Sequence, residues 1–65
     1  MMSWVQLTTP EGPLLVRPES VVAIGPAQHY GVSNRMFRYL GVAGLPVGIQ
    51  VWDTADNMEK LSVQP

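Results

Sequence analysis

The chain has no cysteine among its 65 residues. This absence excludes disulfide bonds, thiolate nucleophiles and thiolate metal sites, and it removes the covalent supports typical of small secreted scaffolds. A cytoplasmic setting is therefore expected. The chain also has a single histidine, His29, and its five carboxylates are spread along the sequence. Because catalysis needs an acid, a base, a nucleophile or a metal held together, we expect no enzyme, no catalytic residue, no metal and no cofactor.

Charge is scarce as well. Charged residues make up 14% of the chain, against about 25% in ordinary domains, and the net charge is -1. Such a balance gives no overall attraction to duplex DNA or to an anionic membrane. The longest apolar stretch, 41–51, contains Pro46 and several glycines and is too short to cross a bilayer, so no membrane partner is expected. A surface poor in charge favours a protein partner or a homo-oligomer.

The clearest pattern is present in residues 47–61. Val47, Ile49 and Val51 alternate with Gly48, Gln50 and Trp52, which predicts a strand. The spacing of Ala55, Met58 and Leu61 then predicts a helix from Thr54 to about Ser62. Asp53 or Thr54 is expected to cap the first turn of this helix, and Asp56 completes an arrangement like a capping box.

Earlier in the chain, alternation predicts strands at 3–9 and 35–40, and short runs that end before a proline predict strands at 14–17 and 21–24. Turns are expected at 10–13 and 18–20, a polar loop at 27–34 and a hairpin turn at 41–44. The prediction is one domain over residues 1–65, in the all-β or α+β class. It is a small bent five-stranded antiparallel sheet or an SH3-like, partly open barrel with one short C-terminal helix. The predicted core consists of Val5, Leu7, Leu14, Val16, Val22, Ile24, Phe37, Val47, Ile49, Val51, Met58 and Leu61.

Two tryptophans suggest a strand order. Trp-Val-Gln-Leu read forward from Trp4 matches Trp-Val-Gln-Ile read backward from Trp52. If the first and last strands pair in that register, Trp4 faces Trp52 on the side away from the core. Exposed indoles indicate a contact surface, and self-association through them is expected. The alternative is that the indoles cover each other, or that the helix covers Trp52.

The succession of strands, turns and closing helix resembles FlbD-type small bacterial proteins and similar short phage or prophage open reading frames. The positions that carry the resemblance are Leu7, Gly12, Val16, Pro18, Val21, Ile24, Val51, Thr54, Met58 and Leu61. The sequence departs from that pattern in its longer 27–34 connection and in its 41–44 turn. The resemblance implies the fold and a phage or prophage origin, with a place in the host cytoplasm or the virion. It implies no catalytic residue.

Residues 28–40 hold half of the basic residues and three of the five aromatic ones. Two functions follow. The first is a non-enzymatic protein–protein interaction module, an accessory or host-modulating protein that docks on a protein partner or on itself. The alternative is a small β-barrel that binds single-stranded nucleic acid by stacking bases on the 35–39 strand. The candidate binding residues are His29, Tyr30, Arg35, Arg38, Tyr39, Trp4 and Trp52, although Phe37 and Tyr39 could instead belong to the core and the arginines could simply solvate an edge strand.

Overall fold

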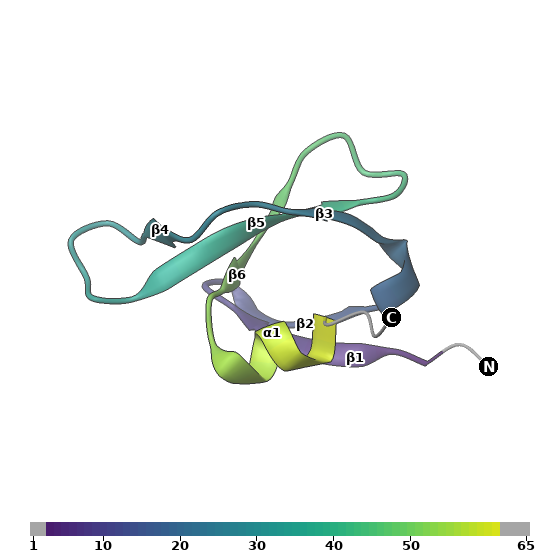
Figure 1. The fold of residues 1–65 in the computed structure, drawn as a ribbon, viewed down its shortest axis with the longest axis horizontal. Coiled ribbons are helices and arrows are strands. Elements are labelled where there is room, and N and C mark those ends of the chain that lie inside the picture. Colours follow the sequence, from purple (N-terminus) through teal and green to yellow (C-terminus); the bar gives the residue numbers. More distant parts are fainter. Residues whose placement is uncertain (1–2, 62–65) are drawn as a thin grey trace.

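The computed structural model describes residues 3–61 as a small β-rich fold closed by one short helix (Figure 1). The elements are β1 (Val5–Thr9), β2 (Gly12–Val16), the 3-10 helix η1 (Pro18–Ser20), β3 (Val21–Ile24), β4 (Gln28–His29), β5 (Met36–Val42), β6 (Ile49–Trp52) and α1 (Ala55–Leu61). The predicted class, a small antiparallel β fold with a C-terminal helix, is confirmed. The strands form two sheets rather than one, and they do not close into a barrel.

The first sheet is the hairpin of β1 and β2, and the second is built around β5. Phe37 pairs with Trp52 of β6 and also with Gln28 of β4, so these two strands lie on opposite edges of β5. Leu40 likewise lies between β6 and β3. Strands β3 and β4 therefore follow each other along one edge of β5, with β6 on the other.

The predicted hairpin at 10–13 is confirmed. Thr9 pairs with Gly12 across a two-residue loop, and Gly12 has a φ of +119°, which a residue with a Cβ rarely adopts. The Thr9 side chain completes the turn, because its hydroxyl donates to the Gly12 carbonyl (2.7 Å) and accepts from the Glu11 N–H (3.1 Å).

The predicted pairing of the first and last strands is wrong. Strand β6 pairs with β5, so that Trp52 lies opposite Phe37 rather than opposite Trp4. A short loop joins β5 to β6, and pairing of such neighbours closes less chain than pairing of the two ends. Strand β1 does lie beside β6, but no ladder joins them, and the side chain of Asn57 bonds to both strands instead.

Two predicted boundaries also shift. Strand β5 runs on through Gly41 and Val42 to pair with β3, so the turn begins later than predicted and Val47 lies in the loop, 72% exposed. The polar loop predicted at 27–34 contains the short strand β4.

The core lies between the two sheets, at the end that α1 covers. Its buried members include Leu7, Val16, Val51 and Leu61 as predicted, with Val5, Leu14, Ile49 and Met58 packed against them. The assignment of Val22, Ile24 and Val47 to the core is wrong, since all three are exposed. Strand β3 packs mainly on β5, and its register shifts between Val21 and Ala23. Of its residues, Val21 packs against the core cluster. Leu40, Trp52 and Asn57, which were not predicted, are buried.

Of the two residues predicted to cap α1, only one does so. Thr54 caps the helix, because its hydroxyl accepts from the Asn57 N–H (3.1 Å). Asp53 instead pairs with Arg38. The predicted docking stripe is correct for Met58 and Leu61, but Ala55 is exposed.

Asn57 joins the two sheets. Its amide nitrogen donates to the carbonyls of Thr8 (2.9 Å) and Trp52 (2.8 Å), and its amide oxygen accepts from the Thr8 N–H (3.0 Å). The side chain thereby acts like one peptide unit of a strand placed between β1 and β6. Within residues 3–61, no helix is both long and apolar enough to cross a membrane.

Candidate functional site

The candidate site is the outer face of the four-stranded sheet. Alternation along β5 turns Met36, Arg38 and Leu40 toward the other sheet and places Phe37 and Tyr39 on the opposite side. Cross-strand partners share a face, so Trp52 joins Phe37, and Gln50 joins Tyr39. We use the name aromatic face for the set formed by Tyr30, Arg35, Phe37, Tyr39, Gln50 and Trp52.

The four rings of the aromatic face form a continuous series of edge-on contacts. Tyr30 packs on Trp52 with ring centres 4.9 Å apart and an interplanar angle of 73°, and on Phe37 at 5.8 Å and 88°. Phe37 in turn meets Tyr39 at 5.3 Å and 82°. Edge-to-face pairs of this kind contribute about 0.5–1.5 kcal/mol each beyond the area they bury. The rings therefore hold one another in fixed positions.

Arg35 covers the ring of Trp52, at one end of this series of rings. Its guanidinium carbon lies 3.6 Å from the centre of the Trp52 ring. Together with Tyr30 it leaves Trp52 only 8% exposed, so the prediction of an exposed indole at this position is wrong. The stacked arginine remains exposed to solvent and gives this end of the face its positive charge.

Tyr39 occupies the other end. Gln50 donates through its amide nitrogen to the Tyr39 hydroxyl (3.2 Å). A Cβ added at Gly48 would lie 3.3 Å from the tyrosine ring and from its Cβ, so the missing side chain there lets the ring lie close to the strand. Tyr39 keeps 42% of its surface exposed and Tyr30 keeps 39%, whereas Phe37 between them is buried.

A compact turn positions Tyr30 and Arg35. The Tyr30 N–H donates to the Arg35 carbonyl (3.0 Å), and the Tyr30 carbonyl accepts from both the N–H and the hydroxyl of Ser33. The Ser33 hydroxyl also accepts from the Arg35 N–H (3.1 Å). The two side chains of the aromatic face therefore leave a hydrogen-bonded turn rather than an open loop.

The structure brings together four of the seven predicted binding residues: Tyr30, Arg35, Tyr39 and Trp52. The other three lie elsewhere. Arg38 points to the inner side, where it donates to Asp53 (2.9 Å) and to the Gly25 carbonyl (3.0 Å). His29 is exposed and pairs with Met36, on that same side. Trp4 directly precedes β1 and is 57% exposed, with the Arg17 guanidinium carbon 4.8 Å from the centre of its ring.

Phe37, a predicted core residue, is buried as expected, but it lies on the aromatic face. The shared alternation of Phe37 and Tyr39 was a signal for this, since residues two apart on a strand point to one side. The position of Trp52 beside Phe37 depended on the strand register, which no local pattern indicated.

Comparison with protein-family models, curated proteins and solved structures gives no match. The interpretation of the aromatic face therefore depends on its geometry. In the described residues, no three His, Cys, Asp or Glu side chains gather into a group that could hold a metal ion. What the face offers is aromatic contact area, one guanidinium and the amide of Gln50.

Proposed function

We propose that this protein is a non-enzymatic interaction module that docks a partner protein on the aromatic face. The observation that carries the proposal is that two rings of the aromatic face are buried and the other two are half-exposed. Phe37 and Trp52 are buried, and they hold the half-exposed Tyr30 and Tyr39 in place. Tyrosine, tryptophan and arginine are the residues that most often dominate binding energy at protein interfaces.

Preorganisation supports the same function. Ordering a mobile side chain on binding costs about 0.5–1.5 kcal/mol, and rings that are already fixed avoid much of that cost. The edge-on packing and the hydrogen bond to Gln50 restrict the tyrosine rings before any partner arrives. The face is therefore suited to contact a complementary surface without rearranging.

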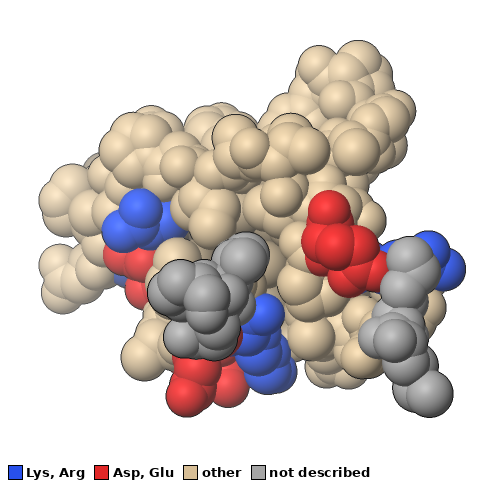
Figure 2. All heavy atoms as spheres, turned by 45° about the vertical axis from the view of Figure 1, so that its right-hand side comes forward, with Lys and Arg blue, Asp and Glu red and all other residues tan. Residues whose placement is uncertain are grey.

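The charge distribution favours a partner with an apolar contact surface. In Figure 2 the upper part of the molecule, formed by the four-stranded sheet and the β5–β6 loop, shows almost no charged atoms. Acidic and basic groups lie side by side lower down. Arg35 adds one cation at the end of the aromatic face, which fits a partner carboxylate at the rim of an otherwise apolar contact.

We expect Tyr39→Ala and Arg35→Gln each to reduce capture of the partner by tenfold or more, since loss of a dominant contact residue costs about 2 kcal/mol. Both side chains lie at the surface, so the melting temperature should change little. The measurement is quantitative mass spectrometry of proteins retained from a host lysate on the immobilised native chain and on each variant.

Matched variants on other surfaces serve as controls. Trp4→Ala removes an exposed ring next to the start of β1, and Lys60→Gln removes one positive charge from α1. Proteins retained by the native chain and both controls, but lost from the two variants of the aromatic face, would support the proposal. Equal retention by all five proteins would remove it.

A second function has one observation in its favour. An aromatic row with a stacked arginine on an open antiparallel sheet is also a platform on which unpaired bases can stack. The chain has only four basic residues against five acidic ones, and Arg38 is engaged with Asp53, so phosphate attraction is weak. Fluorescence anisotropy with a labelled oligothymidylate separates the two functions. Binding that weakens with salt and disappears in Tyr39→Ala would favour nucleic acid.

The wider context follows from the sequence. The cysteine-free composition fits a cytoplasmic protein, and the resemblance to FlbD-type and phage open reading frames fits an accessory or host-modulating role. Within this proposal, the host cytoplasm or the virion is where the aromatic face would meet its partner.

A further inference from the structure

The strand edges of this fold are protected unequally. Side chains of α1 cover the outer edge of β1, because Asn57 bonds to the backbone of Thr8 and the Lys60 ammonium donates to the Gln6 carbonyl (2.8 Å). Strand β3 has an irregular register and is followed by Pro26, and β4 has only two residues. Short strands, bulges, prolines and covering elements are the usual means of blocking edge-to-edge pairing.

Within residues 3–61, no such element protects strand β2 along most of its length. Asn57 bonds both backbone groups of Thr8, so Thr8 and its partner Pro13 point their backbone groups away from each other. By the same alternation the N–H and carbonyl of Leu15, two residues on, point away from β1. Residues 3–61 supply no hydrogen bond to either group.

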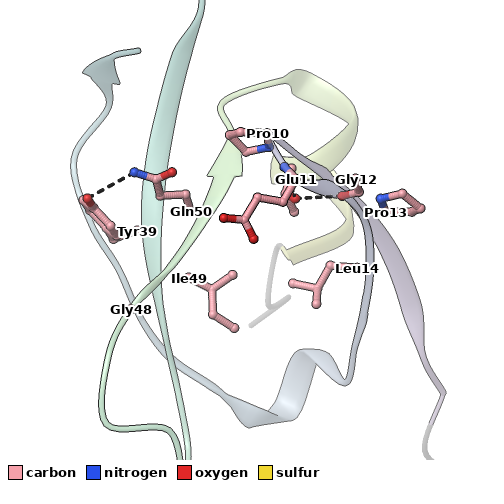
Figure 3. Close-up of a pocket in the computed structure, with 10 residues that line it drawn as sticks. Pro10, Glu11, Gly12, Pro13, Leu14, Tyr39, Gly48, Ile49 and Gln50 are labelled. Carbon is pink, nitrogen blue, oxygen red and sulfur yellow. Dashed lines mark hydrogen bonds between the residues drawn. The ribbon is translucent and has the colours of Figure 1, made fainter. Parts of the chain in front are cut away.

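Open space lies along this edge. A hollow of about 440 Å³ separates the hairpin turn from Tyr39, Gly48 and Gln50, and in Figure 3 Leu14 and Ile49 point toward each other at its floor. A second hollow of about 280 Å³ continues past Leu14 and is lined by Leu15, Val16 and Leu45. Because Val16 faces inward and Leu15 outward, this second hollow reaches the strand edge itself. Leu15 is 61% exposed.

We propose that β2 pairs antiparallel with β2 of a second copy of this chain, with Leu15 opposite Leu15, to make a symmetric dimer with a continuous four-stranded sheet. Leu15 and the backbone edge of β2 are not part of the aromatic face, although the first hollow extends to Tyr39 and Gln50. The inference does not depend on the function proposed above. In this register the two Leu15 residues exchange two backbone hydrogen bonds across the two-fold axis.

The chain itself carries the complement that this edge requires. Pro13 has no N–H, so the residue opposite it must have a carbonyl that needs no donor from Pro13. With Leu15 opposite Leu15, that residue is Arg17 of the second copy. The Arg17 carbonyl already accepts the Ser20 N–H at 2.9 Å in its own chain. The N–H group that Pro13 lacks would therefore lie opposite the Arg17 carbonyl, which already has a hydrogen-bond donor. For this reason we favour a second copy of this chain over an unrelated strand.

Cysteine cross-linking tests the register directly, because the native chain has no cysteine. In a hydrogen-bonded antiparallel pair the two Cα atoms lie about 5.5 Å apart, which a disulfide can bridge. We expect Leu15→Cys to form a disulfide-linked dimer under mild oxidation. The matched control is Gln6→Cys, which lies opposite Leu15 on the same exposed face but one strand further from the edge. In the dimer the two copies of residue 6 would be about 14 Å apart.

The expected result is cross-linking of Leu15→Cys at least ten times faster than of Gln6→Cys, with both variants keeping the native melting temperature. Sedimentation velocity of the unmodified chain should show its mass rising with concentration from one copy to two. Equal cross-linking rates, a monomer at several hundred micromolar, or a dimer that Leu15→Cys does not link would each overturn the proposal. Tyr39→Ala should still dimerise, so failure here leaves the function of the aromatic face unaffected.

Discussion

Replacement of Asn57 by leucine should strongly destabilise the protein, although the two side chains have similar size. Asn57 is completely buried, and its amide is the partner of three backbone groups, the N–H and carbonyl of Thr8 and the carbonyl of Trp52. The hydrogen bond to Trp52 is buried and the two to Thr8 are partly buried, and each such backbone group left without a partner costs about 1–3 kcal/mol. We expect a total loss of about 3–5 kcal/mol, measured by urea unfolding. Such a loss is comparable with the roughly 3–10 kcal/mol expected for a chain of this length.

Two further variants show whether the loss comes from these hydrogen bonds. Lys60→Met removes the neighbouring, exposed contact between α1 and β1, and it should cost less than about 1 kcal/mol. Asn57→Asp keeps the shape but replaces the donating nitrogen by an oxygen. Burial would raise the pKa of that new carboxyl in the folded state, so its protonated form would be the more stable one there. The stability lost by Asn57→Asp should therefore be smaller at pH 4.5 than at pH 7.5. Equal losses for Lys60→Met and Asn57→Leu would contradict the bridging role.

Trp52→Ala should cost about 3–5 kcal/mol, the range for truncation of a buried aromatic residue. The ring is the base on which Tyr30 and Arg35 pack, and its loss also removes their contacts. The measurement is the shift in the unfolding midpoint. A loss of near-ultraviolet circular dichroism from the tyrosines should accompany it, since their fixed orientation depends on the cluster.

Trp4→Ala is the matched comparison. This second indole is exposed and contacts the Arg17 guanidinium, a stacking worth about 0.5–1 kcal/mol at an exposed site. We expect a change within about 1 kcal/mol and unchanged near-ultraviolet signal from the tyrosines. If the two tryptophan variants lost the same stability, the burial of Trp52 under Arg35 would not be a feature of the folded protein in solution.

The sequence by itself determined the local elements. Two-residue alternation located β1 and much of β5, and the apolar run that ends before Gly25 and Pro26 located β3. The turn residues Pro10 to Gly12 predicted the first hairpin. The spacing of Met58 and Leu61 located the helix. Of the two caps predicted for it, Asp53 or Thr54, the second is correct. These features depend on neighbours along the chain, which is why a local pattern can reveal them.

Only the tertiary structure decided which strands lie together. The matching letters around Trp4 and Trp52 suggested a pairing, but the short β5–β6 connection placed Trp52 opposite Phe37 instead. That register created the aromatic face and buried one tryptophan while leaving the other exposed. It also decided the role of Asn57, a polar residue that by its type belongs at the surface. It is buried because two strands that do not pair with each other both need its amide, and this depends on residues 49 positions apart.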